Sequence, residues 1–177
     1  MELHAPLMPL TMPQNWDKRR IDTEGDRCPE CGAQVKGGRG GCQALFDEIT
    51  YAMGEEPRIA ALHRLALDTY CMQHVESYCE SAKSYAAHLV GLWWGVHHLD
   101  DPAPAALALN FLNRNLQLVK PPILSKRGSI TLPALMAAYH ESGDVDQFVN
   151  DVRDWSKEVW DAYASQHEIA QKWFGER

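Results

Sequence analysis

Two cysteines separated by two residues are the part of this sequence best suited to chemistry. Cys28 and Cys31 stand in the pentapeptide Cys-Pro-Glu-Cys-Gly, and Gly32 lets the backbone fold back beneath an ion held by both thiolates. Thiolate pairs of this kind favour soft ions, zinc above all. A redox dithiol is the rival interpretation, but a thioredoxin-like site would sit between a strand and a helix, whereas a glycine-rich stretch follows here. The turn therefore predicts metal binding.

A structural zinc ion takes four protein ligands, so the turn supplies only half of a site. Cys42 follows Cys31 by eleven residues, across a run of glycines that can fold back, and is the easiest third ligand. For the fourth, Cys71 and His74 are spaced i and i+3 on a predicted helix and share a face. Either of them can complete the set.

A second group of side chains is suited to acid–base chemistry. Four histidines lie on helix faces that also carry aromatic or aliphatic residues: His63, His74, His88 and His167. If a metal kept an open coordination position, neighbouring groups would serve as ligand, base or acid. The candidate catalytic residues are His63, Asp68, Tyr70 and His88. The alternative is that each histidine is a core or boundary residue bonded to a neighbour.

Apolar residues recur at spacings of three and four over most of the chain, which predicts helices. The predicted helices span residues 42–54, 57–79, 81–98, 104–112, 131–143 and 145–173. Apart from short strands around the cysteine turn, no alternating pattern indicates a sheet. The predicted fold class is all-α, a helical bundle with an N-terminal irregular loop that resembles a zinc knuckle.

The 177 residues suit one well-buried core rather than two domains. Residues 1–27 carry three prolines and no apolar period, which predicts an irregular arm. Residues 28–177 are expected to form a single helical domain, with a metal-binding knuckle at 28–41 and the bundle at 42–177. The glycine run at 37–41 predicts a loop, and no Gly-Lys-Ser/Thr follows it to indicate a phosphate site.

Charge and composition exclude several classes of protein. The formal net charge is -7 and no basic run exceeds three residues, so nucleic acid is not an expected partner. The apolar stretches fall far below the roughly 18 residues of a membrane span, and the N-terminus lacks the basic region of a signal peptide. Five cysteines cannot all pair within one chain, so reduced thiols are expected. These features predict a soluble, cytoplasmic protein.

Taken in order, these motifs resemble an uncharacterised bacterial family of small helical proteins, catalogued as a domain of unknown function. The resemblance runs from Cys28 to Trp173 and rests on the Cys-Pro-x-Cys-Gly turn, Cys42 and the helix motif His-x4-Asp-x-Tyr-x2-Gln-His, which ends at His74. It implies no activity, because none is known for the family.

Two positions depart from that family's pattern. The family usually has proline after Gln-His, where this chain has Val75, which lets the helix continue. Position 71 is usually not cysteine in the family, so the resemblance favours His74 over Cys71 as the fourth ligand.

The sequence thus predicts a small protein of unknown activity in which Zn²⁺ clasps the N-terminal loop to the bundle. The predicted ligands are Cys28, Cys31, Cys42 and His74. Two alternatives stay open: a metal-dependent hydrolase or transferase that acts on a small molecule, and a scaffold that binds a protein partner or a second copy through Trp93 or Trp94.

Overall fold

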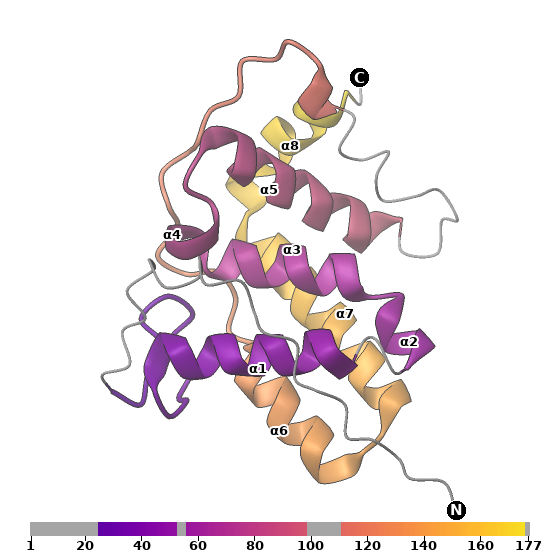
Figure 1. The fold of residues 1–177 in the computed structure, drawn as a ribbon. Helices are drawn as coiled ribbons and strands as arrows, with labels where there is room; N and C mark the ends of the chain where they lie inside the picture. The colour runs from indigo at the N-terminus through magenta and orange to yellow at the C-terminus, as the bar shows by residue number, and fades with distance from the viewer. Residues whose placement is uncertain (1–24, 53–55, 99–110, 176–177) are drawn as a thin grey trace, which may run out of the picture.

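The computed structural model describes residues 25–52, 56–98 and 111–175. Over these ranges the chain forms α-helices α1 to α8 and no β-strand, which confirms the all-α prediction (Figure 1). In place of the short strands expected near the cysteine turn, an isolated bridge pairs Arg27 with Gln34. Residues 1–24 of the predicted arm, the helix stop at Gly54 and most of the predicted helix 104–112 lie outside the described residues.

The first helix, α1 (Gly38–Ala52), begins inside the glycine run that the sequence assigns to a loop. Within this run the preceding turn approaches the helix closely: a Cβ atom on Gly41 would lie 2.0 Å from the Lys36 carbonyl oxygen. Glycine is therefore required there for space as well as for flexibility. The helix thus begins within the run despite the low helix propensity of glycine.

The predicted helix 57–79 is divided into three. The pieces are α2 (Pro57–Ala60), α3 (His63–Gln73) and α4 (Val75–Tyr78). Despite the absence of a proline at position 75, the helix stops at His74, whose φ of -119° and ψ of 50° are not helical. The expectation that Val75 would let it continue is wrong, because His74 is held by contacts from distant parts of the chain.

Helix α5 (Ala82–His97) begins where the sequence predicts, with the Ser81 hydroxyl accepting a bond from the Ser84 amide. It packs antiparallel to α3 (Figure 1). Two glycines on α5 let the helices approach closely: a Cβ on Gly91 would lie 2.0 Å from Asp68 Oδ2, and one on Gly95 would lie 2.7 Å from Leu65 Cδ1.

Helix α6 (Leu132–Ser142) ends at Gly143, whose φ of 63° is the left-handed conformation that closes a helix, as the sequence predicts. Beyond it the predicted helix 145–173 is interrupted. The chain forms α7 (Val145–Ala162), a 3₁₀ turn at Ala164–Gln166 and α8 (His167–Phe174). The break follows Tyr163, which is buried and donates its hydroxyl to the Met72 carbonyl at 2.7 Å.

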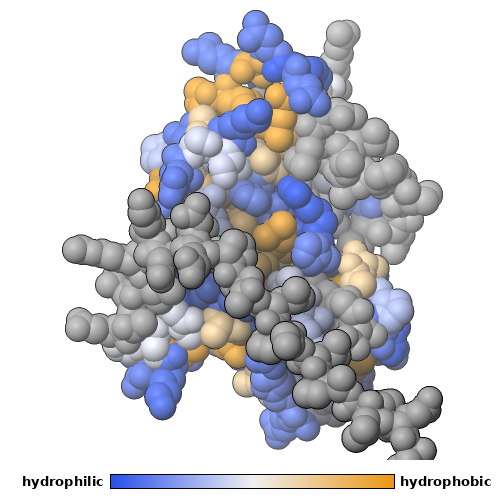
Figure 2. Space-filling model, viewed as in Figure 1, coloured by the Kyte–Doolittle hydropathy of each residue, from blue (hydrophilic) through white to orange (hydrophobic). Residues whose placement is uncertain are grey.

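Helix α3 lies at the centre of the bundle, between α5 on one side and α1 with α6 on the other, with α7 crossing behind it (Figure 1). Helix α1 packs mainly on α6, while α8 covers α5. Large aromatic side chains fill the interior, among them Trp93, Trp155 and Tyr85. In Figure 2 the hydrophobic residues of the described surface gather in separate patches between hydrophilic ones. Within the described ranges, none of the helices combines the length and the apolar character needed to cross a membrane.

Candidate metal centre

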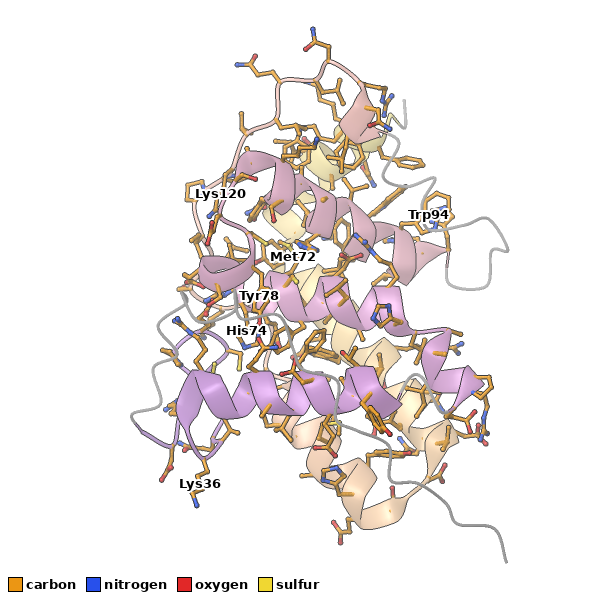
Figure 3. The ribbon with its side chains drawn as sticks, viewed as in Figure 1. Lys36, Met72, His74, Tyr78, Trp94 and Lys120 are labelled. Carbon is orange, nitrogen blue, oxygen red and sulfur yellow. The ribbon has the colours of Figure 1, made fainter. Side chains whose placement is uncertain are left out.

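Four side chains converge where the cysteine turn meets α1 and the end of α3. The ligand atoms of Cys28, Cys31, Cys42 and His74 all lie within 4.8 Å of one another. His74 Nε2 is 3.5 Å from Cys28 Sγ and 3.4 Å from Cys42 Sγ, and the sulfur atoms of Cys31 and Cys42 are 3.8 Å apart. Figure 3 shows His74 at the end of α3 that faces the start of α1. The predicted ligands thus form one group that can hold a metal ion.

Three of the six distances between the ligand atoms fit a tetrahedron around zinc. With Zn–S bonds of 2.3 Å and Zn–N bonds of 2.0–2.1 Å, the edges of a tetrahedron measure about 3.8 Å between two sulfurs and about 3.5 Å between sulfur and nitrogen. The three distances above match these edges. Cys28, Cys42 and His74 are buried and Cys31 is half-buried, so the centre is largely closed to water.

The cysteine turn owes its shape to backbone hydrogen bonds. The Cys28 amide donates to the Ala33 carbonyl at 2.8 Å, and the Gly32 amide donates to the Cys28 carbonyl at 2.9 Å. Gly32 has a φ of 77°, which a residue with a side chain rarely adopts. Arg27 Nε also donates to the Gly32 carbonyl, at 3.0 Å. These bonds turn the Cys28 and Cys31 thiols to the same side of the loop.

The His74 imidazole is oriented by two contacts with Tyr70. Nδ1 donates to the Tyr70 carbonyl at 2.8 Å, which leaves the lone pair on Nε2 directed at the thiols. Metal-binding histidines in proteins show this arrangement, in which the other ring nitrogen donates to a carbonyl or carboxylate. The Tyr70 ring stacks on His74 at a centroid distance of 4.0 Å and on Phe46 of α1 at 4.1 Å. Tyr70, a candidate catalytic residue, therefore lies behind His74, a candidate metal ligand.

Cys28 and Cys42 differ in acidity because hydrogen bonds within the cluster stabilise the thiolate of one and the thiol of the other. Hydrogen bonds from Cys31 and Cys42 hold the pKa of Cys28 well below its usual range, while the bond to Cys28 raises the pKa of Cys42. Burial lowers the pKa of His74, but hydrogen bonds with Cys28 and Cys31 outweigh it and raise this pKa to about 9. A divalent cation would take the place of these shared protons, since only the deprotonated ligands bind it.

Glu30, which sequence reasoning missed, provides a second attachment of the turn to the bundle. Its side chain is buried, and Oε2 accepts from the amides of Glu76 and Ser77, at 3.1 and 3.2 Å. The Ser77 hydroxyl donates to Oε1 at 2.5 Å, and Arg39 Nε lies 2.9 Å from the same oxygen. The residue between the two cysteines thus satisfies the first amides of α4, directly after His74.

Arg127, which is 97 positions from Glu30 in the sequence, also bonds to the Glu30 segment. Its Nη2 donates to the Glu30 carbonyl at 2.9 Å, and its Nη1 donates to Glu76 Oε2 at 2.6 Å. Burial raises the pKa of Glu76, but the bonds with Arg127 and Glu30 outweigh it and lower this pKa to about 2. The sequence places Arg127 in a loop with no local sign of burial, so only the fold reveals this contact.

The histidines considered as a catalytic group do not meet. His63 is exposed at the first residue of α3, and His167 stacks on Trp160 and donates to its carbonyl. His88 pairs with Asp68 through Nδ1 at 2.8 Å. Among the described residues, the Cys28–His74 group is the one set of three or more His, Cys, Asp or Glu side chains with the spacing for a shared ion.

The residues of the helix motif at 63–74 make contacts with different parts of the fold. Asp68 faces His88 on α5, and Tyr70 and His74 face the metal centre. The Gln73 amide donates to the carbonyls of Arg127 and Ile130, and its oxygen accepts from Trp155 Nε1. Gln73 therefore ties α3 to α7 and to the segment before α6.

Comparisons with curated proteins and with solved structures find no match. A family model described as a family of unknown function (DUF5946) matches residues 26–164, a range that contains all four residues of the metal centre. Because the match covers most of the chain, the protein belongs to this family of unknown function.

Proposed function

We propose that the protein binds one Zn²⁺ ion through Cys28, Cys31, Cys42 and His74, and that the ion has a structural role. The observation that carries this proposal is the spacing of the ligand atoms, which corresponds to the edges of a tetrahedral zinc site. The Nδ1 bond of His74 to a backbone carbonyl adds support, because it fixes the tautomer that zinc requires.

A structural role agrees with the number of ligands and with their places in the chain. Four protein ligands leave no position for a substrate or water, as in the closed sites of zinc knuckles. The ion would join the cysteine turn, the N-terminal part of α1 and the junction of α3 with α4. Glycine is a poor helix former, and zinc binding by Cys42 would stabilise this glycine-rich start of α1.

Zinc is the ion that best suits three thiolates and one imidazole at tetrahedral spacing. The same ligand set needs its thiols reduced, so a reducing compartment such as the cytosol fits the proposal. Ferrous iron and cobalt would fit a similar geometry, but such a site binds them more weakly than zinc, so they compete only where zinc is scarce.

Metal analysis of ligand variants tests the proposal. The full chain is purified with a reductant and without chelator, and its zinc content is measured by inductively coupled plasma mass spectrometry. We expect one zinc per chain in the wild type, and much less in Cys28→Ser and His74→Ala. Cys79→Ala is the matched control, because Cys79 is also a fully buried thiol but lies outside the group.

Zinc content in Cys28→Ser and His74→Ala equal to that of the control would refute the ligand set. A metal with water as one ligand would instead favour the alternative of a metal-dependent enzyme, since catalytic zinc sites keep an open position.

A further inference from the structure

A second cluster of polar side chains lies between α3 and α5, apart from the metal ligands. Asp68 is completely buried at its centre. Its Oδ1 accepts from His88 Nδ1 at 2.8 Å, and its Oδ2 accepts from Arg64 Nε at 2.6 Å. The side chains of His88 and Arg64 remain 17% and 34% exposed. The buried carboxylate therefore holds two groups that both reach the surface.

The hydrogen bond to Asp68 fixes which nitrogen of His88 carries the proton. Because a carboxylate accepts, Nδ1 donates, and the lone pair of the neutral ring is on Nε2. None of the described residues forms a hydrogen bond with this Nε2. A buried aspartate that orients a histidine in this way is the arrangement that prepares a general base in serine hydrolases.

The backbone of α5 makes room for this cluster. A Cβ on Gly91 would lie 2.0 Å from Asp68 Oδ2 and 3.1 Å from Arg64 Nη2. Glycine inside a helix costs about 1 kcal/mol relative to alanine. Any larger side chain at position 91 would displace the Asp68 carboxylate, so the glycine leaves the space that the cluster occupies.

We propose that His88 is the general base of a second site on the α3–α5 face, which hydrolyses small esters that carry a carboxylate or phosphate. Arg64 binds the anionic group, and Asp68 is a positioning residue that orients the imidazole. Nε2 takes a proton from water, whose oxygen bonds to the acyl carbon. The alcohol leaves with the electron pair of the broken C–O bond and receives the proton back from Nε2, so ester and water give acid and alcohol.

The test compares two chromogenic esters with the zinc-loaded full chain: 4-nitrophenyl acetate, which is neutral, and 4-nitrophenyl hydrogen succinate, which carries a carboxylate. General-base assistance raises a reaction rate by about 10²–10⁴-fold. We therefore expect His88→Gln to lower the protein-dependent rate at least tenfold with both esters. Arg64→Gln should slow only the succinate ester. The matched control is His97→Gln, an exposed histidine on the same helix.

The role of Asp68 has a spectroscopic readout. Nitrogen-15 NMR of the wild-type imidazole should show the proton of His88 on Nδ1, and Asp68→Asn should disturb this tautomer while His97 is unchanged. The wild-type spectrum needs no variant to fold, so a His88 proton on Nε2 would by itself overturn the proposal. Equal rates in folded, zinc-loaded wild type and His88→Gln would also overturn it. Since zinc content is measured in every variant, failure here is distinguishable from failure of the metal centre.

Discussion

His74 connects the local structure of the chain to its metal centre. The backbone of His74 ends α3, and its Nε2 atom lies next to the thiols of Cys28 and Cys42. Its ring is held by the stack on Tyr70 and by the bond of Nδ1 to the Tyr70 carbonyl. The same residue therefore breaks the helix and presents Nε2, which explains why Gln-His at the end of the motif is followed by a break even without proline.

Replacement of Glu30 by glutamine tests the second attachment of the cysteine turn. Glu30→Gln keeps the shape of the side chain but removes the charge that faces Arg39 and the α4 amides. Hydrogen bonds to charged groups contribute about 1.5–3 kcal/mol, so we expect the free energy of unfolding to fall by that amount in urea titrations of the zinc-loaded protein. Zinc content should stay at one per chain.

Glu141→Gln on the exposed end of α6 is the control, and it should change the free energy of unfolding by less than about 0.5 kcal/mol. If Glu30→Gln is as stable as this control, the Glu30 network does not attach the turn.

Among the helices, the sequence predicts those whose ends are decided locally. Ser81 begins α5 and Gly143 closes α6 because a side-chain cap and a left-handed glycine act within one turn. The breaks at His74 and Tyr163 were not predictable, because they depend on Cys28 and Cys42 in one case and on the Met72 carbonyl in the other.

The same reasoning applies to the site. The four candidate metal ligands were predictable from residue type and spacing, with the choice of His74 supported by the family resemblance. Glu30 and Arg127 lie 97 positions apart, and neither carries a local signal of burial. The pairing of Asp68 with His88 likewise depends on how α3 and α5 pack.

The contact between α3 and α5 leads to a prediction about Gly91. At an exposed position inside a helix, replacement of glycine by alanine stabilises the helix by about 1 kcal/mol. In Gly91→Ala the new methyl group would collide with Asp68, so we expect a loss of about 1–3 kcal/mol, as in overpacked cores. Urea unfolding measures the difference, with Lys83→Ala on the exposed face of α5 as control. A stabilised Gly91→Ala protein would contradict the close packing described here.

For the whole molecule, the account predicts that removal of the metal loosens one part more than the rest. Helix α1 packs mainly on α6, so without zinc the cysteine turn and the start of α1 lose the link that the ion would make to the end of α3. After treatment with a chelator, amide hydrogen exchange should quicken over residues 28–45 while α3, α5 and α7 stay protected. Equal exchange rates over residues 28–45 with and without zinc would show that the ion does not hold the cysteine turn to the bundle.

Stability should also fall at high pH because of buried tyrosines. Burial raises the pKa of Tyr85 to about 12, although its bond to Gln166 works in the opposite direction, and burial also raises the pKa of Tyr163. The unfolded chain has tyrosine pKa values of about 10. Because the folded state keeps the proton longer, this stability is complete below pH 10 and is lost as the pH rises towards 12.

Thermal unfolding across that range, compared with Tyr85→Phe, isolates the contribution of Tyr85. The variant should lose less stability between these pH values than the wild type does. The same slope in both proteins would show that Tyr85 does not titrate in this way.

The central claim is that one zinc ion is bound by three sulfurs and one nitrogen. X-ray absorption at the zinc edge of the purified full chain measures this directly. The account predicts three sulfur neighbours at about 2.3 Å and one nitrogen at about 2.0 Å, with no bound water. A protein without zinc, or a zinc ion with fewer sulfur neighbours and an oxygen ligand, would contradict it.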